Sequence, residues 1–202
     1  MTQPKNRTRR AIIAVVAVVA AIGGSYVALQ ASGVMPMHGN HAGQGHMNGA
    51  DGTGHDEVNM PGLRGENATP EESAELAVMF RNFETLSREV TNLDNGIRTV
   101  TRSSDPVVME NLVSHVTGMI GRVANLDDPK IIIQSPTLDI FFVRGENIQS
   151  DISVTEDGIV VVQTSDDPEV VAALQIHAAE VSAMAERGMQ AVHEMMMKRA
   201  RN

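Results

Sequence analysis

Apolar and polar positions divide the chain into three parts of different character. From Ala11 to Leu29 there is no charged residue, and at 1.5 Å per residue such a run roughly spans a hydrocarbon core of ~30 Å as one helix. Residues 32–65 are rich in Gly and Asn and nearly devoid of branched apolar residues. From residue 66 onward, apolar positions recur with helical and strand periods, which predicts a folded domain.

Four pairs of a polar residue and a proline predict where the helices of this domain begin. Each pair places an N-cap before a proline at the first helical position, and the pairs are Thr69-Pro70, Asp105-Pro106, Ser135-Pro136 and Asp167-Pro168. The first three helices are expected to end near Phe83, Val123 and Arg144, and the fourth is expected to be one long final helix.

Two predicted hairpins lie between these helices. Leu86 and Val90 alternate with polar residues before the turn Asp94-Asn95-Gly96, and a strand returns over 97–101. A second pair of strands, over 148–154 and 159–164, flanks the turn Glu156-Asp157-Gly158. The order of elements is therefore αββα, found twice.

The sequence repeats itself at an offset of 62 residues. Residues 95–119 align without gaps on 157–181 with nine identities in 25 positions, which indicates a duplicated unit with repeats of about 69–125 and 135–199. We therefore predict an α+β domain over 66–202 with a four-stranded antiparallel sheet, helices on one face and a pseudo-two-fold axis. Edge-to-edge joining of the hairpins and exchange of their strands remain open alternatives.

The repeated segment resembles segments of uncharacterised exported bacterial proteins. The resemblance is carried by Ser-x-Asp-Pro-x-Val followed by Leu-x-x-His, within 96–115 and again within 158–177, and its wider extent is about 66–195. It implies export from the cytoplasm and no defined biochemical activity.

The apolar run is expected to be a single transmembrane helix. Residues 1–10 contain four basic residues and no acidic one, so the positive-inside rule predicts a cytoplasmic tail, an anchor over 11–31 in a bacterial inner membrane and a periplasmic domain. A cleaved signal peptide is the alternative, and it gives the same location for the rest of the chain.

Composition and charge exclude several classes of metal site and of binding partner. The chain has no Cys, 13 Met and 2% aromatic residues, which excludes thiolate metal sites and argues against grooves that stack bases or sugars. The formal net charge is −9, although the N-terminal tail is basic. The domain is therefore acidic, and we expect no nucleic-acid partner.

The linker over 32–65 contains a set of candidate metal ligands. Its composition predicts a disordered tether, because it buries too little apolar surface to offset the entropy of ordering. Thioether sulfur and imidazole together favour copper, and the candidate ligands are His38, His41, His46, Met47 and His55. A polar spacer without metal is the alternative interpretation.

A second candidate site comes from the repeat itself. His115 and His177 occupy equivalent helical positions, with Met119 and Met184 on the same faces. Two such imidazoles near a pseudo-two-fold axis fit one copper ion or, as an alternative cofactor, the axial positions of a haem. The simpler alternative is that both are core histidines with ordinary hydrogen-bond partners.

The final helix offers a third cluster on one face, formed by Met189, His193, Met196 and Met197. It suits Cu(I) or, equally, docking on a partner such as a metalloprotein or transporter. No catalytic constellation is recognised, so we expect no enzyme. The sequence thus predicts a membrane-anchored periplasmic protein that captures or delivers copper, with a haem protein and a cofactor-free interaction module as the rival hypotheses.

Overall fold

The computed structural model describes residues 59–201 and has the predicted α+β class. Its helices are α1 (Pro70–Arg81), α2 (Pro106–Ala124), α3 (Asp139–Arg144), α4 (Pro168–Arg187) and α5 (Met189–Arg199). Its strands are β1 (Leu86–Leu93), β2 (Gly96–Ser103), β3 (Gln149–Thr155) and β4 (Gly158–Thr164). Four short 3-10 helices complete the fold: η1 (Pro61–Leu63), η2 (Phe83–Thr85), η3 (Pro136–Leu138) and η4 (Gly145–Asn147).

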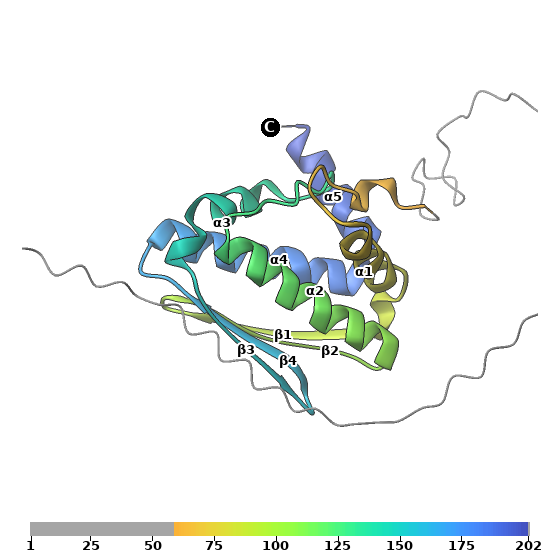
Figure 1. Cartoon of the computed structure of the whole chain (residues 1–202), viewed down its shortest axis with the longest axis horizontal. Helices are drawn as coiled ribbons and strands as arrows, with labels where there is room; N and C mark the ends of the chain where they lie inside the picture. The colour runs from red at the N-terminus through yellow and green to blue at the C-terminus, as the bar shows by residue number, and fades with distance from the viewer. Residues whose placement is uncertain (1–58, 202) are drawn as a thin grey trace, which may run out of the picture. The chain divides into compact units, whose positions relative to one another are not determined.

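The four strands form one antiparallel sheet in the order β1-β2-β4-β3. The helices lie on one side of it, with α2 and α4 directly across the strands (Figure 1). The prediction of a four-stranded antiparallel sheet is confirmed, and the two hairpins join edge to edge through β2 and β4.

The helix starts follow from the predicted caps. Thr69 forms a capping box with Glu72 at the start of α1. The carboxylates of Asp105 and Asp167 accept backbone N–H groups at the starts of α2 and α4, and the Ser135 hydroxyl does the same before η3. These side chains satisfy amide donors that the first helical turn leaves without an intrahelical partner.

The strand register relates the two hairpins. Leu93 pairs with Gly96 and Thr155 with Gly158 at the two turns. In the central pair of strands, Thr99 faces Val161, two residues that the sequence offset of 62 also matches. The same offset therefore relates both turns and the middle of the sheet.

Each long helix packs on the hairpin of the other half. Leu174 of α4 shares a core cluster with Ile97 of β2, whereas Leu112 of α2 shares a second cluster with Ile159 of β4. Leu174 and Ile159 are almost completely buried. Because the apolar face of each hairpin is covered by the other half's helix, neither half has a complete core alone.

The predicted single final helix is wrong. Gly188 has φ 54° and ψ −136° and separates α4 from α5. A Cβ at this position would lie 2.7 Å from Cδ1 of Phe83, so the break needs both the backbone freedom and the small size of glycine. As a consequence, Met184 and Met189 lie on different helices.

The folded domain begins before residue 66. Met60 and Leu63, which the sequence places in the linker, are 6% and 2% exposed. Gly65 forms a β-bridge with Ile131. These apolar residues are buried against the domain, so the C-terminal end of the predicted linker is part of the fold.

None of the helices within 59–201 is long and apolar enough to cross a membrane. The predicted basic tail over 1–10, the anchor over 11–31 and the linker up to residue 58 lie outside the described residues.

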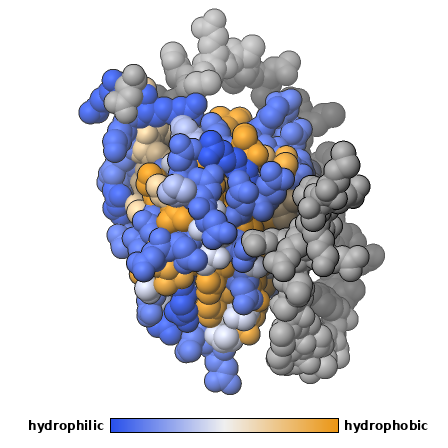
Figure 2. Space-filling view, turned by 90° about the vertical axis from the view of Figure 1, so that its left-hand side faces the viewer, coloured by the Kyte–Doolittle hydropathy of each residue, from blue (hydrophilic) through white to orange (hydrophobic). Residues whose placement is uncertain are grey.

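The face of the domain seen in Figure 2 is mainly hydrophilic, with apolar groups between the polar ones. Exposed apolar side chains are spread over several elements, including Val107 of α2, Val143 of α3, Val154 of β3 and Ile176 of α4. Apolar residues exposed singly in this way are normal on protein surfaces and do not by themselves indicate a docking site.

Candidate functional site

A cavity of about 300 Å³ lies between the sheet and the helices. Its walls are mostly apolar and come from the helices α1, α2, α3 and α4 and from the strands β1, β2 and β4, with Leu112, Phe141 and Ile159 among the lining residues. A few polar side chains also face it, including Thr99, Thr101 and Gln163. Small-molecule sites are of this kind, with volumes of ~300–1,000 Å³, apolar walls and few polar groups.

Four of the candidate ligands predicted from the sequence line this one cavity. They are His115 and Met119 of α2 and His177 and Met184 of α4. The structure thus brings residues about 62 positions apart in the sequence to the same space. They meet here because α2 and α4 both lie on the same face of the sheet.

His115 is held in a largely buried position on α2. Its side chain is 16% exposed, and its Nδ1 lies 3.7 Å from Oε2 of Glu75. Burial lowers the pKa of His115 to about 4, although the charge of Glu72 acts in the opposite direction. The imidazole is therefore neutral at neutral pH, the state in which it binds metals.

His177 has a similar environment on α4. Its Nδ1 lies 3.6 Å from Oε2 of Glu180, and its ring packs edge-on against Phe141 with 5.6 Å between the ring centroids. Glu180 accepts hydrogen bonds from the hydroxyls of Ser135 and Thr137. Burial alone would raise the pKa of Glu180, but His177 and these two hydroxyls stabilise the carboxylate and lower it.

Both histidines therefore direct Nδ1 at a glutamate, and Nε2 does not face this carboxylate. The two Nδ1 atoms are buried and form no hydrogen bond with any described residue, since both carboxylate contacts exceed hydrogen-bond length. Within the described part of the chain, His, Asp and Glu side chains form no group of three that would hold a metal. A metal in the cavity would accordingly need the methionine sulfurs as ligands.

The other predicted ligands are not brought to the cavity. Met189, His193 and Met196 lie on α5, where His193 and Met196 are exposed. The candidate ligands of the tether lie outside the described residues: His38, His41, His46, Met47 and His55.

Arg88 is the cavity residue that sequence reasoning missed. It lies on β1 with its side chain turned toward the helices, and Nη1 donates a hydrogen bond of 2.6 Å to Oγ1 of Thr101. Its Nε is buried, and no residue of the described part of the chain accepts a hydrogen bond from it. Burial lowers the pKa of Arg88 to about 10, so the guanidinium is charged at neutral pH. The alternation of Leu86, Arg88 and Val90 along the strand already contained this signal, because it puts a cation at an inward position.

No carboxylate of residues 59–201 lies within ion-pair distance of Arg88. Elsewhere the buried or half-buried arginines are paired, as Arg122 is with Glu72 and Asp127. A buried cation without an anionic partner is costly, and in proteins it commonly marks a functional position.

The candidate functional site is therefore the cavity, with His115, His177 and Arg88 in its wall. Comparison of the chain with models of protein families, with curated proteins and with solved structures gives no significant match.

Proposed function

We propose that the folded domain binds a small, mainly apolar molecule in the cavity between its sheet and its helices. The observation that carries the proposal is the cavity itself, which combines about 300 Å³ of space with predominantly apolar walls and a few inward polar groups. Taking ~30 Å³ for each water-sized group, the space suits a ligand of about ten non-hydrogen atoms.

Methyl NMR of the methionines tests this proposal directly. In the full chain, embedded in a lipid nanodisc and labelled with ¹³C at the Met methyl groups, titration with indole should shift the Met119 and Met184 signals in a saturable way. Met196 is exposed on α5 and is not among the cavity residues, so its signal should stay in place and serve as the internal control.

A pair of valine substitutions on α2 separates filling of the cavity from general perturbation. Val116 lines the cavity, whereas Val113 is half-buried on the same helix and does not line it. We expect Val116→Phe to abolish the indole-dependent shifts because the added ring occupies the space, and Val113→Phe to retain them. Indole binding that is equal in both variants would contradict the proposal.

We infer that the domain consists of two αββα units related by a pseudo-two-fold axis. Supporting this inference, the offset of 62 matches both turns, the capping aspartates and the facing pair Thr99 and Val161. His115 and His177 then approach the cavity from equivalent places in the two units.

A second candidate function is copper binding, as the sequence predicts for an exported, membrane-anchored protein with a His/Met-rich tether. Its support is that His115, Met119, His177 and Met184 line one cavity. Each histidine also faces a glutamate through Nδ1, as metal-binding histidines usually do through the nitrogen that is not the ligand. The haem alternative gains no support from a cavity of about 300 Å³, because the macrocycle is several times larger than a ligand of about ten non-hydrogen atoms.

Competition with a Cu(I) chelator measures Cu(I) affinity and distinguishes binding in the cavity from binding by the predicted tether. In the full chain, the double variant His115→Ala and His177→Ala should bind Cu(I) at the cavity site at least about tenfold more weakly than the wild type. Addition of Cu(I) to this variant should leave the methyl signals of Met119 and Met184 unchanged. The comparison variant replaces the five tether ligands by Ala and should keep that site. If the histidine variant binds Cu(I) like the wild type, copper does not bind in the cavity.

A further inference from the structure

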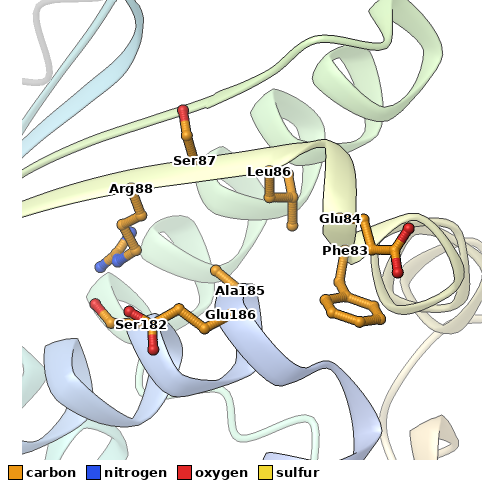
Figure 3. A pocket seen from close by; sticks show the side chains of 8 residues that line it. All are labelled: Phe83, Glu84, Leu86, Ser87, Arg88, Ser182, Ala185 and Glu186. Atoms are coloured by element: carbon orange, nitrogen blue, oxygen red, sulfur yellow. The ribbon is translucent and has the colours of Figure 1, made fainter.

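Arg88 lies where the cavity meets an open cleft. The cleft has a volume of about 430 Å³ between the start of β1 and the C-terminal part of α4. In Figure 3 the Arg88 guanidinium extends from β1 toward α4, on the side where Ser182 and Glu186 lie. Phe83, Leu86, Arg88 and Ala185 line the cleft and also line the cavity, so the two spaces adjoin at these residues.

We propose that the cavity ligand is an apolar carboxylic acid, which enters through this cleft and pairs its carboxylate with the guanidinium of Arg88. This inference rests on the proposed function, because it names the ligand class and orientation for the same cavity. The apolar part of the ligand extends inward among the apolar walls, and the charged end stays at the boundary with the cleft.

The hydrogen-bond state of Arg88 favours a carboxylate. Nη1 already donates to Thr101, whereas Nε is buried and has no acceptor among residues 59–201. The edge of a guanidinium that contains Nε presents two parallel N–H groups, and a carboxylate accepts both of them at once. A ligand carboxylate therefore supplies both the missing acceptor and the missing negative charge.

The acidic residues of the cleft favour a singly charged ligand. Glu84 and Glu186 line the cleft beside Arg88, and the chain as a whole has a net charge of −9. A phosphate monoester would bring about two negative charges into this setting and face repulsion that one guanidinium does not offset. A carboxylate brings a single charge.

The apolar majority of the walls explains why the rest of the ligand is hydrocarbon. Apart from Arg88, the polar side chains at the cavity include Thr101 and the histidines, and Thr101 is already used by Arg88. A ligand with further charged groups would leave them buried without partners. An unbranched acid of medium length, or an aromatic acid of similar size, meets these conditions.

Octanoate and its neutral analogue octanamide test the proposal in the full chain, in nanodiscs and with the methionine methyl signals as the readout. We expect octanoate to shift the Met119 and Met184 signals with at least about tenfold higher affinity than octanamide, given the strength of hydrogen bonds to charged groups. Octyl phosphate should bind more weakly than octanoate. Equal affinity for the acid and the amide, or tighter binding of the phosphate, would overturn the assignment.

Substitution of Arg88 distinguishes a ligand contact from a structural role. Arg88→Gln should lower octanoate affinity at least about tenfold and leave octanamide affinity unchanged, with Arg88→Lys intermediate. The matched control is Arg98→Gln, because Arg98 is an exposed arginine on β2. A parallel loss for acid and amide would show that Arg88 only supports the fold, and would overturn the proposal.

Glu186→Gln is expected to raise octanoate affinity, whereas Arg88→Gln lowers it. Removal of a carboxylate from the cleft should strengthen octanoate binding a few fold and leave octanamide binding unchanged. If indole binds in the cavity but octanoate does not, the carboxylate assignment fails while the proposed function stands. If neither ligand shifts the Met119 and Met184 signals, both proposals fail.

Discussion

Lowering the pH from 7 to 4 is expected to reduce the free energy of unfolding by about 3 kcal/mol through His115 alone. Burial lowers the pKa of this imidazole from 6.5 to about 4 in the folded protein. Below pH 6.5 the unfolded chain takes up a proton at His115, whereas the folded chain resists protonation until about pH 4. Stability is therefore unaffected above pH 6.5 and falls as the pH decreases through this window.

Urea unfolding followed by far-ultraviolet circular dichroism at pH 7 and at pH 4 measures this effect. His115→Gln removes the titrating group, so about 3 kcal/mol of the pH-dependent difference should disappear, even if the variant is less stable at both pH values. Val113→Ala on the same helix serves as the control, because it removes half-buried apolar contacts and no titrating group. A wild-type difference that persists in His115→Gln would contradict the assignment of the effect to His115.

Replacement of Gly96 by Ala is expected to lower the free energy of unfolding by about 3 kcal/mol or more. Gly96 is buried at the start of β2 and pairs with Thr164 of β4. A Cβ at this position would clash with the backbone carbonyl oxygen of Gln163. Backbone atoms of a central strand do not move aside easily, so the substitution must separate β2 from β4 and disturb the sheet under the cavity.

Gly118→Ala is the matched control for this substitution. Gly118 lies in α2, and a Cβ there would meet no described atom within 4 Å beyond its chain neighbours and the adjacent backbone of its own helix. Alanine restricts the unfolded chain and favours the helix, so we expect this variant to be about 0.5–1 kcal/mol more stable. Chemical denaturation of both variants gives the comparison. A Gly96→Ala variant as stable as the wild type would show that the two central strands are not held as closely as described.

The local elements could be predicted because their causes are local. Asp105 and Asp167 cap helices through hydrogen bonds to amides two or three residues away, and the turns at Gly96 and Gly158 follow from residues next to each other in the chain. The sequence predicts too long a final helix, because the break at Gly188 depends on the ring of Phe83, which is far away in the sequence. The end of the linker was misjudged for the same reason, since burial of Leu63 depends on distant segments.

The candidate site was predictable only in part. Helical spacing and the repeat singled out His115, His177 and their methionine neighbours, and all four line one cavity. The sequence does not indicate the role of Arg88, because it does not show whether a carboxylate pairs with an inward arginine on a strand. Its free Nε and the missing carboxylate are properties of the packed structure.

The sequence by itself determined the caps, the turns, the strand alternation and the match between 95–119 and 157–181, because each depends on residues close together or on direct comparison of one segment with another. The tertiary structure decided the rest. It covered each hairpin with the helix of the other half, left a cavity between them and placed Arg88 in the cavity wall, where no carboxylate of residues 59–201 pairs with it. These features arise from contacts between distant segments, whose packing and desolvation no local pattern specifies.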